Sequence, residues 1–339
     1  MTAVLVVNAG STSLKLHRVD DDETVTPLAS LEDVRDEPLA AIVHRVVHGG
    51  AEFRGPIIID ARVRAAIFAL EAVDSIHNAP ALRAIERTKH LLPGIAEIAV
   101  FDTGFHTTLP AAARTYALPE RWRTEWGIAR FGFHGLSVEW CAARAPVSRL
   151  VVCHLGGGCS ITAVADGRSV DTTMGFSPLD GIPGATRSGA VDPQAIIFAL
   201  RSRRLTLDAL DDDLNCRSGL VGLGGSPDMR EIEAQDGLAL AVFVHRVAAA
   251  IAAMTASLGG LDALVFTAGI GEGSAVVRER VCARLGFLGI AIDAARNLAA
   301  APDTRIDADC ASVAVHVIHT REELVAARAA RRLLDGGDR

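Results

Sequence analysis

The sequence predicts an α/β protein built from two domains. Its 339 residues exceed the length at which one hydrophobic core usually suffices. Short runs rich in β-branched residues alternate with alanine-rich runs of helical length, a pattern typical of α/β proteins. Residues 4–16 and 150–164 each read as a strand, a turn of small residues and a second strand. This repeat indicates two related domains, with two unrelated hairpins as the open alternative.

The elements follow from the same patterns. Buried strands are expected at residues 4–7, 57–60, 95–101, 150–154 and 264–267. Helices are expected at residues 62–73, 80–92, 193–203, 237–258 and 274–285. The helix ending at 258 is apolar enough for a membrane span, but His245 and Arg246 near its middle would be costly in lipid. We therefore interpret it as a core helix that ends at Gly259.

The composition narrows the class of protein. Half of the residues are hydrophobic and 22% are charged, and the net charge is 34 − 41 = −7. No basic run is present, which disfavours nucleic-acid and anionic-membrane partners. Six cysteines without a CxxC pair are too few for a disulfide scaffold and indicate free thiols. With no basic region before Val4–Val7, no signal peptide is expected, and the protein is expected in the cytoplasm.

Three glycine-rich segments are candidate phosphate-binding turns: residues 10–13, 156–158 and 269–273. Glycine lets backbone N–H groups approach phosphate oxygens closely, because no Cβ intervenes. The third segment lies between an expected strand and an expected helix, whose N-terminus also favours an anion. Most glycine-rich turns are only turns, and the Walker A pattern is absent, so a P-loop enzyme is excluded.

Two arginines stand in unusual surroundings, Arg45 among apolar residues and glycines, and Arg187 in a glycine-bounded segment. A buried arginine is more often paired with a structural carboxylate than with a ligand. Guanidinium is nevertheless also the group best suited to bidentate hydrogen bonds with carboxylates and phosphates. His77, His134 and His154 adjoin small or amide residues. A lone histidine is usually structural, but a set of them beside glycine turns suggests a site.

Asp102, Thr103 and Gly104 also match the aspartic-peptidase motif. That chemistry needs two carboxylates that share a proton, and the motif occurs once here. Such peptidases are rich in strands, whereas this chain is rich in helical segments. The peptidase interpretation is therefore disfavoured.

Taken together, segments in one order along the chain resemble the motifs of the acetate kinase family. They are residues 8–15, 44–50, 77–80, 101–106, 131–135, 154–158, 171–176, 184–189, 226–231, 266–274 and 321–324. The resemblance implies a two-domain actin-like (ribonuclease H-like) duplicated fold with a nucleotide cleft between the domains. Residues 1–106 plus 324–339 would form one domain and residues 107–323 the other. It further implies a cytoplasmic homodimer that transfers phosphoryl reversibly from ATP to acetate, giving acetyl phosphate and ADP.

The resemblance also implies roles for the residues that match. Asp102, His134 and Arg187 match catalytic residues, and Arg45 matches the arginine that binds the substrate carboxylate. The family's acyl pocket falls on Val47, Ile76, Phe133 and Pro178. Its nucleotide contacts fall on Lys15; on His154, Leu155, Gly156, Gly157 and Gly158; on Asp228, Met229 and Arg230; and on Gly269, Ile270, Gly271, Glu272 and Gly273. Its Mg²⁺ ligands, which Mn²⁺ would also suit, fall on Asn8 and Glu322.

Three departures from the family pattern are visible. Gly157 and Gly273 stand where the family usually has asparagine, and the segment between Lys15 and Arg45 is shorter. Two alternatives therefore remain beside acetate kinase: a kinase for propionate or another short carboxylate, and a nucleotide-binding protein of the same fold with little turnover.

Overall fold

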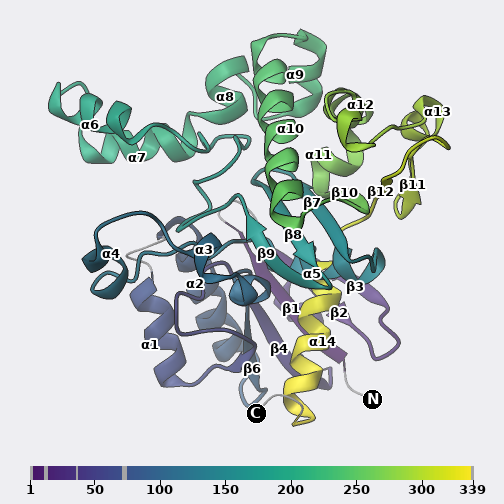
Figure 1. Cartoon of the computed structure of the whole chain (residues 1–339). Coiled ribbons are helices and arrows are strands. Elements are labelled where there is room, and N and C mark those ends of the chain that lie inside the picture. Colours follow the sequence, from purple (N-terminus) through teal and green to yellow (C-terminus); the bar gives the residue numbers. More distant parts are fainter. Residues whose placement is uncertain (1–2, 11–13, 36, 71–74, 337–339) are drawn as a thin grey trace. The chain divides into compact units, whose positions relative to one another are not determined.

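The structure is a computed structural model that describes residues 3–10, 14–35, 37–70 and 75–336, without the side chains of residues 75–77 (Figure 1). It separates into two compact units. The first contains Met1–Thr107, Phe133–Trp140 and Arg321–Arg339, and the second contains Thr108–Gly132 and Cys141–Thr320. The expected boundaries did not foresee that Phe133–Trp140 would join the first unit. The division into functional domains stays a prediction.

The first unit is built on a six-stranded sheet in the order β3-β2-β1-β4-β6-β5. The strands are β1 (Ala3–Ala9), β2 (Leu14–Val19), β3 (Val25–Leu28), β4 (Leu39–Val46), β5 (Ile57–Ile58) and β6 (Glu97–Phe101). β4 runs parallel to both β1 and β6, while β2, β3 and β5 are antiparallel to their neighbours. Three parallel strands therefore end at one edge, the usual place for a site in such sheets.

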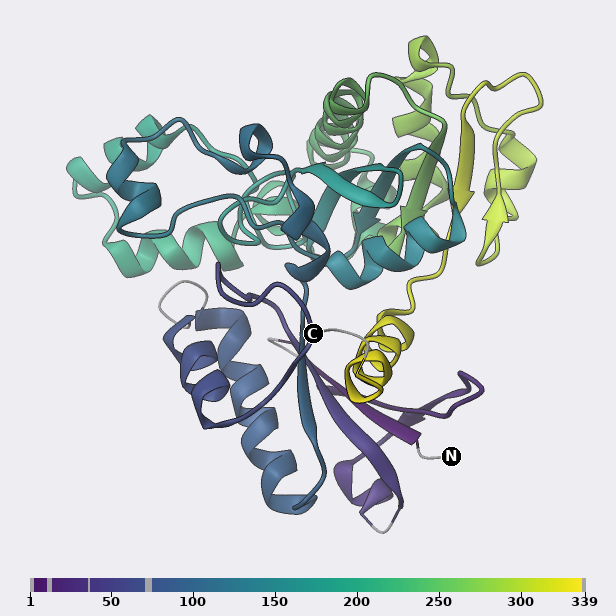
Figure 2. The ribbon, with the colours of Figure 1, turned by 60° about the horizontal axis from the view of Figure 1, so that its bottom comes forward.

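Helices cover both faces of this sheet. Figure 2 shows α1 (Ala61–Ala69) and α2 (Ser75–Leu91) on one face and α14 (Glu322–Leu334) on the other. Leu5, Val7 and Ile42 pack in one apolar cluster with Ala84 of α2. Because β1 and β4 are covered on both sides, they read as nearly continuous apolar runs. Short 3₁₀ helices lie at η1 (Leu31–Val34) and η3 (Gly104–Thr108).

The second unit repeats the strand order of the first. Its strands are β7 (Arg149–Leu155), β8 (Cys159–Ala165), β9 (Arg168–Thr172), β10 (Ala263–Thr267), β11 (Thr304–Arg305) and β12 (Ala314–Val317). The order β9-β8-β7-β10-β12-β11 corresponds to β3-β2-β1-β4-β6-β5, and β10 is parallel to both β7 and β12. β8, β9 and β11 are antiparallel to their neighbours, as their counterparts are in the first unit. The duplication predicted from the two opening hairpins is confirmed.

The helix α10 (Leu238–Leu258) forms the centre of the second unit. It is long and apolar enough to cross a membrane by composition alone. Its residues Phe243, Val247 and Ile251 are buried in a cluster with Val151 and Phe266 of the sheet. It is thus a core helix, as expected. The remaining helices are α3 (Ala111–Arg114), α4 (Glu120–Thr124), α5 (Gly135–Arg144), α6 (Pro193–Arg201), α7 (Leu207–Cys216), α8 (Gly219–Gly224), α9 (Met229–Gln235), α11 (Ala268–Gly273), α12 (Ala275–Ala283), η4 (Gly286–Leu288) and α13 (Ala294–Leu298).

Some local expectations were wrong. β5 was expected to be buried, but it is a two-residue edge strand and Ile58 is 50% exposed. α2 begins at Ser75 and runs through Pro80 instead of starting there, at the cost of the one backbone hydrogen bond that Pro80 cannot donate. The segment 269–273 was expected as a turn but lies in the short helix α11. All six cysteines are free, as predicted.

Candidate active site

A polar cluster lies where β1, β4 and β6 end. Asn8 and Arg45 are direct partners in the β1–β4 register, and Asp102 follows β6. The guanidinium of Arg45 donates from Nε to Asp102 Oδ1 at 2.8 Å and from Nη2 to Asp102 Oδ2. Its Nη1 donates to Asn8 Oδ1 at 3.0 Å. This bidentate geometry fixes the direction of the guanidinium plane.

Glu322 joins this cluster from the first position of α14. Its Oε2 lies 3.7 Å from Arg45 Nε and accepts a hydrogen bond from Asn8 Nδ2 at 3.5 Å. Asn8 and Glu322 are 314 positions apart in sequence, so the fold of the first unit alone brings them together. The structure thus places side by side the two residues that the resemblance assigned to a metal.

The charges of the cluster are held in a buried setting. Asp102 is fully buried and the Arg45 side chain is 15% exposed. Burial alone would lower the pKa of Arg45, but the charges of Asp102 and Glu322 outweigh it and raise the pKa above its usual range. Arg45 therefore stays cationic, between two carboxylates. A bound cation would meet one net negative charge here.

The donor atoms of the cluster suit Mg²⁺. Within the residues the structure describes, no group of three His, Cys, Asp or Glu side chains could form a metal cage. Mg²⁺ does not need one, because it usually keeps several waters and binds one or two carboxylates plus substrate phosphates. Glu322 offers a carboxylate and Asn8 an amide oxygen, both hard ligands.

The segment carrying Phe133 and His134 is tied to the same cluster. Gly135 N donates to the carbonyl oxygen of Asp102 at 2.9 Å, and a Cβ at position 135 would overlap that oxygen. His134 has a φ of 60°, which is uncommon for a residue other than glycine. The strained backbone and the close approach at Gly135 place the two residues beside Asp102.

Buried histidines support this segment. The rings of Phe133 and His48 pack edge to face, with their centroids 5.4 Å apart. The Phe133 carbonyl oxygen accepts a hydrogen bond from His106 Nε2 at 2.9 Å. Burial lowers the pKa of His106 to about 4, so this histidine is a neutral donor at pH 7. Asn78 exchanges two hydrogen bonds with the backbone of His48, of 3.1 and 3.2 Å. These contacts fix the chain next to Val47, which is buried.

The other candidate positions of the first unit are only partly described. Lys15 lies exposed on β2 and is the register partner of Asn8. The residues Ser11–Ser13 of the first glycine-rich segment lie outside the described residues, and so do the side chains of Ile76 and His77. The assigned roles of these residues stay predictions.

In the second unit, the segment from His154 to Gly158 ends β7 and turns into β8. His154 and Leu155 are buried, and Gly156 N donates to Gly158 O at 3.1 Å. A Cβ at Gly157 would meet no atom within 4 Å. The carbonyl of Gly157 accepts from Ala185 N at 2.9 Å, which links this turn to the loop that carries Arg187.

The segment Gly269–Gly273 is held from both ends. Glu272 accepts from Ala268 N at 2.8 Å and Thr320 N at 3.1 Å, and its Oε2 lies 2.6 Å from His319 Nδ1. Ala268 has a φ of 66°, so the chain turns sharply from β10 into α11. A Cβ at Gly269 or Gly273 would meet no atom within 4 Å. The fold therefore does not require glycine at these two exposed positions.

Arg278 also holds this segment, and the sequence analysis missed it. Its side chain is buried, and Nη1 donates to the carbonyls of Gly271 and Glu272 at 2.9 and 2.7 Å. Nε and Nη2 donate to Asn297 at 2.8 and 2.9 Å. Arg278 is followed on α12 by Glu279 and Arg280, so the local sequence does not show which of these charged residues is buried or which carbonyl groups it contacts.

The remaining positions of the second unit lie on other elements. Asp228 caps α9 by accepting from Arg230 N at 2.9 Å, and its contacts with the Arg230 side chain lower the pKa of Asp228 to about 2. Met229 is buried, whereas Arg230 is largely exposed. Arg187 donates from Nη1 to the carbonyl of Pro178 at 3.4 Å. In the first unit the structure thus brings Asn8, Arg45, Asp102 and Glu322 into contact. In the second it links the His154–Gly158 turn to the loop that carries Arg187.

The comparison with protein families decides the assignment. The model of the acetokinase family matches residues 27–328. The chain belongs to the acetokinase family. Its resemblance to that family, inferred from the motifs, is confirmed.

Relatives and solved structures agree with the assignment. The chain is 44% identical over 299 residues to the acetate kinase of Protochlamydia amoebophila, covering 85% of this chain and 75% of that protein. It is 47% identical over 302 residues to the acetate kinase of Gloeobacter violaceus, covering 84% and 74%. A propionate kinase from Francisella tularensis superposes with a TM-score of 0.90 at 33% identity, covering 97% of this chain and 99% of that one. An acetate kinase from Entamoeba histolytica superposes with a TM-score of 0.88 at 29% identity, and the match covers 98% of this chain and 100% of that one. The two-domain α/β, actin-like fold predicted for the chain is confirmed.

Proposed function

We propose that this protein catalyses the reversible, Mg²⁺-dependent transfer of a phosphoryl group from ATP to acetate, which yields acetyl phosphate and ADP. Membership of a family of carboxylate-acceptor phosphotransferases supports the reaction class. The observation that carries the proposal is the cluster of Arg45, Asp102, Asn8 and Glu322 at the carboxyl edge of the first sheet. It combines a fixed guanidinium with hard oxygen ligands.

Arg45 is suited to binding the acceptor carboxylate. A guanidinium has five N–H donors, and contacts within the described part of the chain use three of them. Asp102 and Asn8 fix the orientation of the Arg45 guanidinium. Its two remaining N–H groups, one on Nη1 and one on Nη2, are then available to a ligand. The acceptor is already ionised at pH 7, because carboxylates have pKa values near 4. Asp102 is therefore needed to orient Arg45, not to remove a proton.

The phosphoryl group carries the charge that the site has to stabilise. Arg187 and His134 can donate to its equatorial oxygens, where charge develops during transfer. Mg²⁺ held by Asn8 and Glu322 would neutralise charge on the nucleotide phosphates. In this proposal a carboxylate oxygen of the acceptor attacks the γ-phosphorus of ATP directly and ADP leaves. No side chain of the protein is therefore phosphorylated during the reaction.

The nucleotide is assigned to the glycine-bearing segments of the second unit. Gly269 leaves open space where a side chain would stand, and its backbone needs no left-handed conformation. A ligand that approaches the backbone closely explains glycine at such a position better than the fold does.

Acetate is proposed over propionate because Val47 and Phe133 are both buried and apolar. One methylene in such a pocket is worth about 1–3 kcal/mol of discrimination. Propionate is then a poorer substrate and not an excluded one. A kinase for propionate is the second candidate, favoured by the structural likeness to the Francisella enzyme.

The experiment is an ATP-dependent hydroxamate assay with acetate, propionate, butyrate or no carboxylate. Acyl hydroxamate formed with acetate at the highest kcat/KM supports the proposal. A higher value for propionate supports the second candidate. Binding of ATP without acyl hydroxamate from any carboxylate would overturn both.

We also infer that the protein is a homodimer that pairs through α6. No side chain of this helix is buried, and Ile197 and Phe198 are 39% and 59% exposed. The region is self-complementary in charge, with Arg201, Arg203 and Arg204 near the end of α6 and Asp208, Asp211, Asp212 and Asp213 on α7. A two-fold contact would bring each basic end to the acidic helix of the second copy.

Sedimentation equilibrium tests this inference. The wild-type chain should have twice its monomer mass, and Phe198→Glu should reduce that to the monomer. Leu298→Glu is the matched control, because Leu298 is 81% exposed on α13 and should leave the dimer intact. A monomeric wild type, or a dimeric Phe198→Glu, would overturn the pairing.

A further inference from the structure

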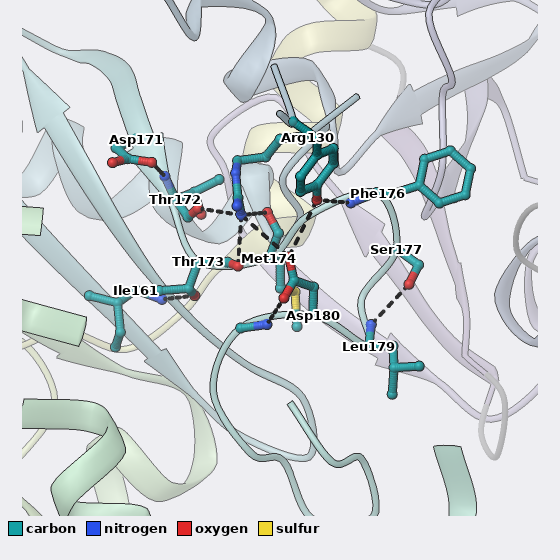
Figure 3. Close-up of polar contacts among 12 residues, drawn as sticks. Arg130, Ile161, Asp171, Thr172, Thr173, Met174, Phe176, Ser177, Leu179 and Asp180 are labelled. Atoms are coloured by element: carbon teal, nitrogen blue, oxygen red, sulfur yellow. Dashed lines mark hydrogen bonds and ion pairs between the residues drawn. The ribbon is translucent and has the colours of Figure 1, made fainter. Parts of the chain in front are cut away.

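One cluster of the second unit has no role in the function described above. It consists of Tyr116, Arg130 and Asp180, which we call the tyrosine brace. Figure 3 shows Arg130 beside the carbonyl groups at the end of β9 and just after it, with Asp180 nearby. Tyr116 and Arg130 contact residues 172–181, the segment that contains Asp180 and Pro178.

Arg130 is the centre of the brace. Its Nη1 donates to three consecutive carbonyl oxygens, those of Thr172, Thr173 and Met174, at 3.0, 2.9 and 3.1 Å. The same nitrogen lies 3.7 Å from Asp180 Oδ2. Three carbonyls in sequence cannot be reached by one donor in a regular strand. The contacts therefore define how the chain leaves β9.

Tyr116 closes the brace from the other side. Its hydroxyl accepts from Phe176 N at 2.9 Å and donates to Asp180 Oδ2 at 3.3 Å. The Arg130 guanidinium lies over the Tyr116 ring, with its Cζ atom 5.4 Å from the ring centroid. Burial raises the pKa of Tyr116, so the hydroxyl keeps its proton at pH 7 and can act as donor and acceptor at once.

Asp180 and two glycines complete the arrangement. Asp180 Oδ1 accepts from Gly181 N at 2.8 Å, and Gly181 has a φ of 98°, which favours glycine. A Cβ at Gly175 would overlap both the Tyr116 hydroxyl and the Asp180 carboxylate. The segment is thus fixed at its start, its middle and its end by one set of side chains.

We propose that the tyrosine brace positions the Pro178 wall of the acyl pocket and, through it, Arg187. Pro178 lies inside the braced segment and accepts from Arg187 Nη1 at 3.4 Å. The proposal rests on the proposed function, in which Arg187 donates to the phosphoryl group, and on the family resemblance, which assigns Pro178 to the acyl pocket. The three residues are positioning residues. They set substrate selectivity without touching the substrate.

Tyr116→Phe is the main test, because it removes one hydroxyl and keeps the ring beneath Arg130. We expect kcat/KM for acetate to fall about ten-fold, since a small misplacement of reacting groups is costly. The KM for ATP should change by less than about two-fold. The ratio of kcat/KM for propionate to that for acetate should rise, because a loosened Pro178 wall excludes the longer chain less.

The selectivity ratio separates positioning from a merely structural role. A variant that only folds less completely loses both activities in proportion, so its ratio stays at the wild-type value. Thr115→Val is the matched control, because it removes the exposed hydroxyl of the preceding residue and should change nothing. Gly175→Ala, which forces Tyr116 and Asp180 apart, should reproduce the Tyr116→Phe ratio. An unchanged ratio in both Tyr116→Phe and Gly175→Ala would overturn the proposal.

A readout without turnover is available because Tyr116 is the only tyrosine of the chain. Its ionisation can be followed by tyrosinate absorbance in the intact protein. Asp180→Asn should lower the pKa of Tyr116, because the carboxylate charge and the hydrogen bond to it both raise that pKa in the wild type. An unchanged titration would contradict the brace. Failure of the proposed function shows separately, as a wild type that forms no acyl hydroxamate.

Discussion

The two units share a strand order and differ in what stands at the ends of equivalent strands. In the first unit, β1, β4 and β6 lead to charged or amide side chains, Asn8, Arg45 and Asp102. In the second, the equivalent β7 and β10 lead to backbone-rich segments, His154–Gly158 and Gly269–Gly273. The same scaffold therefore presents side-chain charge on one sheet and exposed backbone on the other.

The difference indicates that the two units bind different ligands, which we call the division of labour. A small carboxylate and a metal ion are recognised by charged side chains. A polyphosphate can be recognised by backbone N–H groups where glycine allows close approach. We therefore assign the acceptor and the metal to the first unit and the nucleotide to the second. The predictions below test that assignment, from the largest expected effect to the smallest.

Removing Arg187 should have the largest effect. Arg187→Ala should lower kcat by about 10²–10³, the usual loss when a donor to developing charge is removed. The protein should stay folded, because Arg187 lies in a loop and is not part of the hydrophobic core. Steady-state kinetics with a thermal melt would check this. A folded variant that keeps more than half of the wild-type kcat would remove Arg187 from the catalytic group.

The metal assignment separates two neighbouring glutamates. Glu322→Ala should raise the Mg²⁺ concentration for half-maximal rate about ten-fold or more, because Glu322 and Asn8 share the cluster. Glu323→Ala is the matched control on the same helix turn. The measurement is rate against free Mg²⁺ at fixed ATP. Equal shifts in the two variants would mean that the effect is structural.

The acyl pocket should respond to a smaller side chain. Val47→Ala should raise the propionate-to-acetate ratio of kcat/KM by about ten-fold, since one methylene is worth about 1–3 kcal/mol in an apolar pocket. Kinetics with both acceptors would measure the ratio. A flat or falling ratio would show that Val47 does not line the pocket.

The smallest effect expected is on stability in mild acid. The folded pKa of His106, about 4, lies below the unfolded value of 6.5, so the unfolded state binds more protons between these pH values. His106 thus contributes stability that is present above pH 6.5 and is lost as the pH falls through 4. His106→Gln keeps a donor for the Phe133 carbonyl and should flatten the fall in unfolding free energy over that window. His90→Gln, at an exposed position, should keep the wild-type slope.

The sequence predicted the duplication and the buried strands β1, β6, β7 and β10, because such strands are continuous apolar runs and both hairpins have small-residue turns. It missed the parallel strands β4 and β12. It also predicted which residues meet at the first site, through motifs. It could not predict the contacts that hold them. The Asp102–Gly135 approach and the carbonyl partners of Arg278 and Arg130 join residues far apart in sequence, and backbone acceptors have no residue signature.

The exposed edge strand β5 was mispredicted for a related reason. Ile57 and Ile58 look like core residues in a short window, but strand order decides burial, and β5 is the last strand of the sheet. The helix α11 was mispredicted as a turn because glycine has a low helix propensity. Glu272 and Arg278 offset that propensity through contacts that the local sequence does not show.

The most direct test of the division of labour compares the two Michaelis constants in Arg45→Lys and Gly269→Ala. Alanine at position 269 meets no atom within 4 Å and favours a helix by up to about 1 kcal/mol, so this variant should melt no lower than the wild type. We predict that Gly269→Ala raises the KM for ATP and leaves that for acetate unchanged, while Arg45→Lys does the reverse. If either variant raised both constants equally, or raised only the constant assigned to the other unit, the division of labour would be contradicted.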